Sequence, residues 1–495
     1  MTTLRLRALL LPVPLLALLG LLQGCAVGPD FRAPAAPATP SVAAAPLPAR
    51  TAEAEGPAGG PQRFALGQGV ASQWWKAFGS PGLDALVDAA LAASPDLQAA
   101  EAALRNAQET AFAQRGAFWP TVDASYMPTR QKTSGALSSP LADGDITRYT
   151  LHTAQLSIGY APDVFGGTRR AVEAQDAQVD VQRWQREAVG TTLVTNVVST
   201  AIQEASLRAQ IEATQQLVDL ATRLLDGARR RHAAGQIGGA DIAAQESALA
   251  QMQATLPPLQ KQLAAQRSRL AVLTGRLPGD PLPQQFTLDA LQLPAELPVS
   301  LPSQLVQQRP DIRAAEAQLH AAAAQVGVAT AARLPNLTLT ATLGSSALGV
   351  SQLLRSGGGF WSVGGTLLQP VFHGGMLLHQ QRAAQAAYAQ AEAQYRSTVL
   401  TAFQNTADTL QAIVSDADTL RATAAAEAAA RRSLAAVQRQ REAGAAAQAD
   451  LVLAQQTLQQ AMLATAQARA ARLGDSVALY QALGGWWQVA DSSAR

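Results

Sequence analysis

The sequence contains one series of landmarks twice, in the same order. A proline followed by aspartate and an apolar residue opens a helical pattern at Pro95 and again at Pro310. The later landmarks also recur in order: Pro120 with Pro335, Phe165-Gly166-Gly167 with Phe372-His373-Gly374-Gly375, and Ala234-Gly235 before Asp241 with Ala443-Gly444 before Asp450. Ordered repeats at matched spacing indicate an internal duplication. We therefore expect two copies of one unit, residues 81–280 and 301–487, separated by a linker over 281–300 and followed by a tail over 488–495.

The amino terminus has the pattern of a secretory signal. Arg5 and Arg7 precede an apolar run over residues 8–22, which is too short to span a bilayer comfortably. The run ends in Leu22-Gln23-Gly24-Cys25, which resembles the cleavage box of a bacterial lipoprotein. We predict a signal peptide over residues 1–24 and acylation of the Cys25 thiol, which anchors the mature chain to a membrane outside the cytoplasm.

Cys25 is the only cysteine of the chain, so a disulfide or a thiolate metal site has no second cysteine to use. A buried cysteine without a role is the remaining alternative. Ala26 after it favours sorting to the outer membrane, as in many Gram-negative lipoproteins. Residues 25–80 are predicted as a lipidated arm, because 33–69 are rich in alanine, proline and glycine and read as a tether or an extended segment.

Two stretches in each half alternate apolar and polar residues. In the first half the apolar positions are Val122, Ala124 and Tyr126, then Ala154, Leu156, Ile158 and Tyr160; in the second they are Leu337, Leu339, Ala341 and Leu343, then Trp361, Val363, Gly365 and Leu367. Such strands are typical of a membrane-spanning barrel, although a soluble sheet half covered by a core alternates too. Four strands cannot close a barrel, and an open sheet in lipid leaves backbone groups unpaired. If the sheet lies in a membrane, several chains must share it, and three would supply twelve strands.

The remaining patterns predict long helices packed as coiled coils. Residues 168–233 form one uninterrupted helical pattern, and 241–274 carry Ile242, Leu249, Leu256, Leu263 and Leu270 at heptad spacing. Pro257-Pro258 inside the second pattern predicts a kink, with a break as the alternative. The helices over 95–118 and 241–274 together match the length of 168–233, and 302–333 with 450–480 match 376–443. We therefore expect two short helices stacked end to end beside one long helix in each half.

Several motifs stand in an order that resembles one known family, and the resemblance covers nearly the whole mature chain. They are Gly24-Cys25-Ala26-Val27-Gly28-Pro29-Asp30-Phe31, Trp74-Trp75-Lys76-Ala77-Phe78, Arg309-Pro310-Asp311-Ile312 and the paired Gly/Asp turns. Together they resemble the TolC-type outer membrane factors, in particular the NodT-like lipoprotein branch of tripartite efflux systems. The resemblance implies a mainly α fold with a small β part: a homotrimer whose twelve-stranded transmembrane β-barrel, four strands per chain, continues into a long periplasmic α-helical coiled-coil barrel.

The same resemblance implies a location and a function. The protein is expected in the outer membrane of a Gram-negative bacterium, lipid-anchored and extending into the periplasm. It would serve as a passive exit duct for drugs or other small molecules. The implied partners are a periplasmic adaptor (membrane fusion) protein and an inner-membrane transporter of the resistance-nodulation-division (RND) class.

The resemblance also assigns roles to the turns between the long and returning helices. The residues that match adaptor-docking tips are Gly235, Gln236, Asp241, Gly444 and Ala445. Asp450 matches a residue of the closed pore entrance, and Leu453 matches the next ring position. Three symmetry-related Asp450 carboxylates would form an acidic ring that attracts cations, beside an apolar level at Leu453. For the two aspartates, helix capping near the positive dipole end is the alternative.

No pattern in the sequence indicates catalysis. The five histidines fall on different predicted elements, and Gly357-Gly358-Gly359 lies between two strands rather than between a strand and a helix. No enzyme activity, cofactor or metal is expected, and a net charge of +2 gives no global case for nucleic-acid binding. Two other functions stay open: an outer membrane duct for type I polypeptide secretion, against which the lipid anchor weighs, and a non-conducting coiled-coil tether of the cell envelope.

Overall fold

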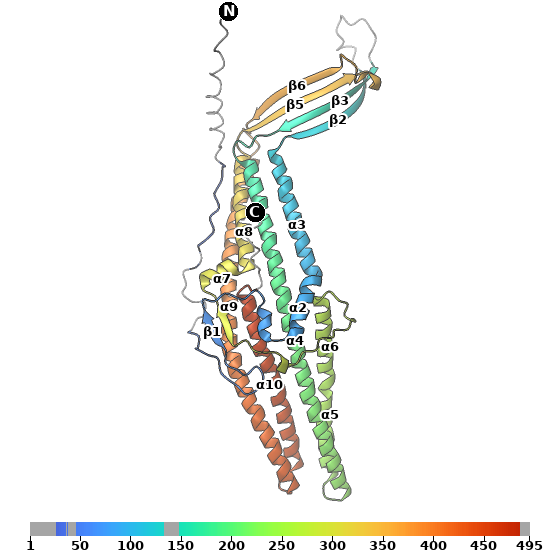
Figure 1. Cartoon of the computed structure of the whole chain (residues 1–495), viewed down its shortest axis with the longest axis vertical. Helices are drawn as coiled ribbons and strands as arrows, with labels where there is room; N and C mark the ends of the chain where they lie inside the picture. The colour runs from blue at the N-terminus through green and yellow to red at the C-terminus, as the bar shows by residue number, and fades with distance from the viewer. Residues whose placement is uncertain (1–25, 36, 38–45, 133–147, 486–495) are drawn as a thin grey trace, which may run out of the picture. The chain divides into compact units, whose positions relative to one another are not determined.

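The computed structural model describes residues 26–35, 37, 46–132 and 148–485, and Figure 1 shows their helices and strands. The predicted signal peptide, Cys25 and the tail over 488–495 lie outside the described residues. The chain divides into two compact units. The sheet unit comprises residues 1–33, 105–181 and 316–394, and the helical unit comprises 34–104, 182–315 and 395–495.

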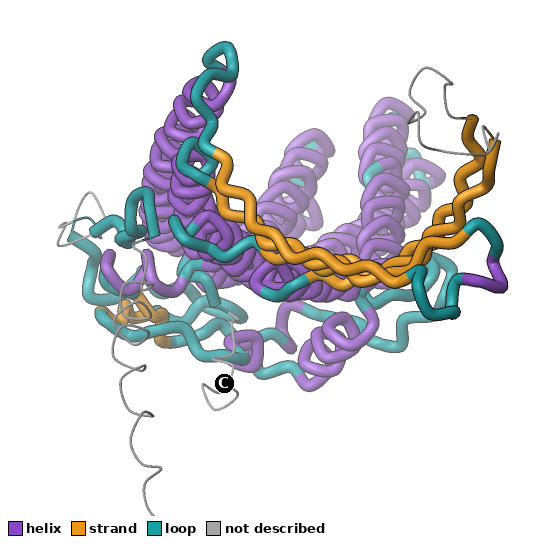
Figure 2. Tube along the Cα trace, turned by 90° about the horizontal axis from the view of Figure 1, so that it is seen from above, coloured by secondary structure: helices purple, strands orange, loops and turns teal. Residues whose placement is uncertain are grey.

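The sheet unit contains four antiparallel strands in the order β2-β3-β5-β6. They are β2 (Thr121–Lys132), β3 (Arg148–Tyr160), β5 (Asn336–Ala347) and β6 (Gly359–Leu368). The central pair joins the two halves of the duplication, because β3 belongs to the first and β5 to the second. Figure 2 shows that the sheet is curved across its width.

The register places the predicted apolar positions in rows on one face of the sheet. One row is Val122, Ile158, Ala341 and Val363, and the next is Ala124, Leu156, Leu343 and Trp361. Threonines and serines occupy the opposite face, where the Thr342 and Ser362 hydroxyls hydrogen-bond at 2.6 Å. The apolar face is open in this chain, because the side chains of Trp361 and Val363 are each 75% exposed. The predicted alternation is therefore confirmed.

The long helices have the predicted extents. α4 (Gly167–Ala233) and α9 (Met376–Glu442) each contain 67 residues. The short helices are α2 (Pro81–Ala93), α3 (Pro95–Arg115), α5 (Gly239–Ala254), α6 (Leu256–Leu273), α7 (Pro302–Gln308), α8 (Pro310–Ala331) and α10 (Gln448–Ala482). None of the helices among the described residues combines the length and apolar character needed to cross a membrane.

Prolines divide two segments that were predicted as single helices. The segment over 302–333 is two helices, because Pro310 holds Arg309 in an extended conformation (φ −74°, ψ 124°). The segment over 241–274 is interrupted at Thr255 instead of being only kinked, since Pro257 and Pro258 have no N–H to donate to the preceding turn. Thr255 keeps right-handed helical angles (φ −80°, ψ −19°), so the break is one residue long.

The Arg-Pro-Asp motif closes the end of α10. Arg309 is buried, and its Nη1 donates a hydrogen bond to the Ala482 carbonyl at 2.7 Å. Its Nη2 donates to Asp311 Oδ2 at 2.6 Å, which compensates the guanidinium charge. The motif therefore ties the start of α8 to the last turn of α10. A cation is favourable there, because the carboxyl end of a helix is the negative end of its dipole.

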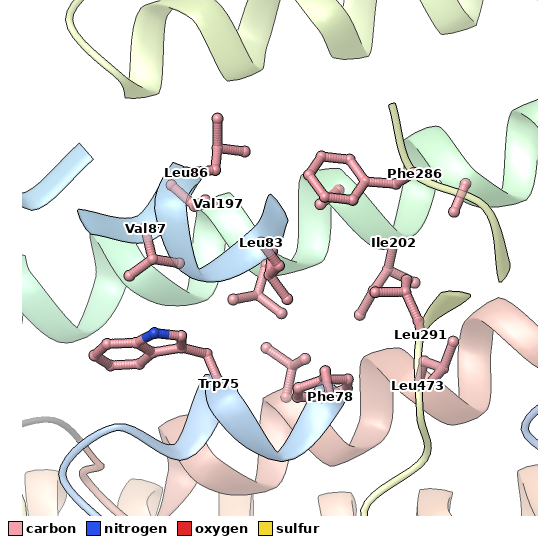
Figure 3. Packing of buried hydrophobic residues seen from close by; sticks show 14 of the residues in the cluster. Trp75, Phe78, Leu83, Leu86, Val87, Val197, Ile202, Phe286, Leu291 and Leu473 are labelled. Atoms are coloured by element: carbon pink, nitrogen blue, oxygen red, sulfur yellow. The ribbon is translucent and has the colours of Figure 1, made fainter. Parts of the chain in front are cut away.

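The two stretches predicted as linkers contribute to the core of the helical unit. β1 (Arg63–Leu66) pairs in parallel with β4 (Glu296–Val299), so the arm and the inter-repeat segment form one small sheet. The 3-10 helix η1 (Trp74–Phe78) places Trp74, Trp75 and Phe78 in the main apolar cluster. Figure 3 shows Trp75 and Phe78 facing Leu83 of α2, Ile202 of α4 and Leu473 of α10. The arm is thus packed rather than free over these residues.

Arg472 of α10 holds the arm in place. Its side chain is 0% exposed and donates hydrogen bonds to the carbonyls of Ala58 at 2.9 Å and Gly60 at 2.8 Å and to Thr51 Oγ1 at 2.8 Å. Burial lowers the pKa of the Arg472 guanidinium.

We expect Arg472→Met to lower the free energy of unfolding by about 3 kcal/mol, because the oxygen atoms of the arm that bond to Arg472 lose their donor. Chemical denaturation should detect this loss, whereas Arg421→Met, at an exposed Arg421–Asp418 pair, should change stability little.

Two carboxyl groups meet between α9 and α10. Burial, and then the neighbouring Asp416, raise the pKa of Asp475 to about 7. Between pH 4 and 7 the folded protein therefore holds a proton that the unfolded chain releases, so the free energy of unfolding falls as the pH rises through this range.

We expect Asp475→Asn to raise the melting temperature by a few degrees at pH 8 and to flatten its dependence on pH. Unfolding followed by circular dichroism at pH 5 and pH 8 tests this, and an unchanged slope would contradict it.

Candidate gate and docking tips

The helical unit ends in two hairpins, α4 with α5 and α9 with α10. At each turn a glycine in the left-handed region ends the long helix: Gly235 at φ +73° and Gly444 at φ +76°. The following residue donates its N–H back across the last turn, from Gln236 to the Arg231 carbonyl at 2.9 Å and from Ala445 to the Gln440 carbonyl at 2.8 Å. This is the Schellman arrangement, which requires a residue without a Cβ penalty at the glycine position.

The predicted docking residues lie at these tips. Gly235, Gln236, Gly444 and Ala445 are exposed, and Asp241 is half-buried in the first turn of α5. The structure brings Gly235, Gln236 and Asp241 to one turn and Gly444 and Ala445 to the other. The two turns therefore expose backbone and mostly small side chains.

The predicted gate residues lie on the start of α10. Asp450 Oδ2 accepts a hydrogen bond from the Ala447 N–H at 2.9 Å, so the capping role expected as an alternative is present. Leu453, three residues later on the same helix face, is 64% exposed. Asp450 and Leu453 therefore present a carboxylate and an apolar side chain side by side on one exposed surface.

A polar seam that the sequence analysis missed joins the two hairpins. Buried Gln245 of α5 donates to Gln455 Oε1 at 3.3 Å and accepts from Gln448 of α10. Further along, Gln456 donates to Gln251 Oε1 at 3.2 Å and Gln459 donates to Thr255 Oγ1 at 3.3 Å. The sequence does contain a sign of this seam, because Gln448 and Gln455 are one heptad apart on α10 and therefore lie on the same helix face. An apolar cluster that includes Leu217, Met252 and Leu451 flanks this glutamine seam.

A groove of about 760 Å³ opens beside the seam and is lined by the ends of α4 and α9 and the start of α10. Four of its lining side chains are guanidinium groups, those of Arg223, Arg230, Arg231 and Arg441. Burial, and then the charge of Arg231, lower the pKa of Arg441, while Asp241 acts in the opposite direction. The neighbouring Arg229 differs from these, since it pairs with Glu246 at 2.8 Å. The region next to the tips is therefore strongly basic.

A duplicated pair of long-helix hairpins joined to an open, curved sheet with one apolar face is the design of a subunit from an outer membrane channel. A protein family model described as outer membrane efflux protein matches residues 86–276 and again residues 301–485. The matched segments cover more than half of the chain, so the chain belongs to the outer membrane efflux protein family. The predicted recognition and fold class, including the internal duplication, are confirmed.

The similarity between this chain and individual relatives extends over most of both sequences. The pyoverdine export outer membrane protein OpmQ of Pseudomonas aeruginosa is 35% identical over 418 residues, which are 84% of this chain and 88% of the relative. The antibiotic efflux pump outer membrane protein ArpC of Pseudomonas putida is 29% identical over 94% of each chain. The solved structure of the outer-membrane channel OprN matches with a TM-score of 0.82 at 27% identity, covering 93% of this chain and 99% of that one.

The glycine at each tip sets a testable requirement. We expect Gly444→Val to loosen the α9–α10 turn by roughly 1–2 kcal/mol, because a β-branched residue is strained at φ +76°. Limited proteolysis should then cut the turn faster than in the unmodified protein. Ala445→Val at the adjacent position, which is not in the left-handed region, is the matched control. Equal cleavage of both variants would show that the turn does not depend on the glycine.

Proposed function

We propose that this protein is the exit duct of a tripartite efflux pump, which passively conducts drugs or other small molecules across the periplasm and the outer membrane. The observation that carries the proposal is the match of both repeats to outer membrane efflux proteins, over nearly the whole length of relatives named for export and efflux. Those relatives export pyoverdine and antibiotics by name, which makes small organic molecules the cargo class that we propose here.

The proposed working form is a homotrimer. Among the described strands, β2 and β6 each pair on one side only, and the apolar face between them is exposed. Three copies joined edge to edge supply partners for these strands in a twelve-stranded transmembrane barrel. A lipid on Cys25 would anchor the assembly to the outer membrane in addition to the barrel.

The proposed partners are a periplasmic adaptor and an inner-membrane RND transporter. The exposed turns at Gly235 and Gly444 support docking of the adaptor, since they offer closely approachable backbone at the end of each hairpin. The transporter supplies the energy, and the duct supplies a continuous path. Binding of the adaptor to the isolated protein, and its loss when Gly235-Gln236 and Gly444-Ala445 are replaced by bulky residues, tests this assignment.

The proposed gate consists of Asp450 and Leu453 on α10. In a trimer the three Asp450 carboxylates form a ring that concentrates cations, and the exposed Leu453 side chains form an apolar constriction next to it. The Ala447–Asp450 hydrogen bond fixes the orientation of each carboxylate. Capping and cation attraction are compatible, because the hydrogen bond engages Oδ2 and a cation can approach Oδ1.

Planar bilayer recordings test the duct and the gate together. We expect the purified protein to conduct small currents that a trivalent cation blocks, and Asp450→Asn to weaken that block by roughly tenfold, since the ring loses its charge while the amide oxygen still caps α10. Asp418→Asn, on the exposed surface of α9, is the matched control. A protein that never conducts would support the envelope tether instead, and unchanged block in Asp450→Asn would remove Asp450 from the gate.

A further inference from the structure

The motif Gly28-Pro29-Asp30-Phe31 follows the predicted lipidation site and takes no part in the proposed duct. In the sheet unit this segment lies against the first turns of α4 and the helix α8. The Val27 N–H donates to the Phe165 carbonyl at 3.2 Å, and the Val27 carbonyl accepts from Arg170 Nε at 3.2 Å. The amino-terminal segment is therefore held by its backbone at the corner that follows β3.

Arg170 makes the central contact of this segment. Its side chain is 6% exposed, and Nη2 donates to Asp30 Oδ1 at 2.6 Å while Nη1 donates to Glu173 Oε2 at 2.8 Å. Since Nε donates to the Val27 carbonyl, all three nitrogen atoms of the guanidinium are bonded, two of them to carboxylates and one to a backbone carbonyl. A lysine could not replace it, because a single ammonium lacks this planar fork.

An aromatic contact extends the site to α8. The Phe31 ring stacks on His320, with ring centroids 4.4 Å apart and planes inclined by 13°. His320 Nε2 lies 2.9 Å from Glu173 Oε1, so Glu173 connects the imidazole to Arg170. Burial opposes the charge of Glu173, but hydrogen bonds from Arg170 and His320 lower its pKa overall. Asp30 and Phe31 thus contact a connected set of three side chains.

Three glycines make room for the segment. Gly28 has φ +101°, and a Cβ on it would lie 2.5 Å from the Gly327 Cα. A Cβ on Gly327 would lie 2.9 Å from the Val27 carbonyl oxygen, and one on Gly166 would lie 2.6 Å from the Ala26 Cα. Glycines therefore stand on both sides of the contact, and their missing side chains allow the two backbones to approach closely.

We propose that Arg170, Glu173, His320, Gly166 and Gly327 form a binding site for the chain's own mature amino terminus, an amino-terminal clamp for residues 26–31. Because Ala26 lies against Gly166 at the β3–α4 corner, a lipid on the preceding residue, Cys25, would be tethered through Ala26 to that corner. The clamp thus fixes the acyl chains at the base of the sheet and sets the depth of the strands in the membrane. This role of the clamp rests on the proposed lipidation of Cys25.

Hydrogen exchange of the purified, full-length protein tests the clamp. Residues 26–31 are expected to exchange slowly, and Arg170→Gln and Asp30→Asn to speed their exchange by roughly tenfold, the change that loss of a charge-assisted hydrogen bond produces. Arg115→Gln removes an exposed arginine–aspartate pair of the same unit and is the matched control. Asp30→Asn changes only the bound segment, so it remains informative if Arg170→Gln does not fold.

Mass analysis of the amino-terminal peptide separates the clamp from the lipid. A Cys25→Ser protein, secreted with an ordinary cleavable signal peptide, is expected to lack acyl chains and to keep slow exchange at residues 26–31. Exchange that is equally fast in the unmodified protein, Asp30→Asn and Arg115→Gln would overturn the clamp. A Cys25 without lipid in the unmodified protein would refute the anchoring role and leave the binding of residues 26–31 intact.

Discussion

Backbone hydrogen bonding at the two edges of the sheet is the constraint on which the rest of the structure depends. β2 and β6 each have a neighbour on one side, and the rows through Val363 and Trp361 leave one face apolar. An apolar face excludes water, and unpaired edges are costly away from water. The proposed trimer meets both conditions, because its sheet continues from one chain into the next.

Duplication supplies the repeated geometry, and small local changes make the two halves unequal. The returning helix of the first half breaks at Thr255 because of two prolines, whereas α10 runs for 35 residues without interruption. Both long helices end in the same glycine turn, but only the second returning helix has its aspartate bonded to the turn backbone among the described hydrogen bonds. The halves therefore share a scaffold while their returning helices differ in continuity and in the hydrogen bonding of the aspartate at the turn.

The sequence was sufficient for features that depend on local periodicity. Heptads and alternation predicted the long helices and the facing of each strand, since these follow from residues within one element. It was insufficient for contacts between distant segments. Arg472 bonds to Ala58, and Gln62 to Ser476, across more than 400 residues, and nothing in the alanine- and proline-rich arm signals such partners. The motif around Asp30 could be recognised in the sequence, but its contacts with Arg170 of α4 and His320 of α8 became apparent only in the structure.

The glutamine seam between α5 and α10 gives the hairpins an unusual mechanical property. Amide pairs such as Gln245–Gln455 each contribute only about 1 kcal/mol net, because water replaces them well. The Nε2 of Gln455 and the Oε1 of Gln448 are buried without a partner in the described part of the chain, so hydration would satisfy groups that the packed seam leaves unsatisfied. The amide pairs themselves therefore resist separation of the hairpins only weakly, and the apolar cluster that includes Leu217, Met252 and Leu451 supplies the larger part of the cohesion.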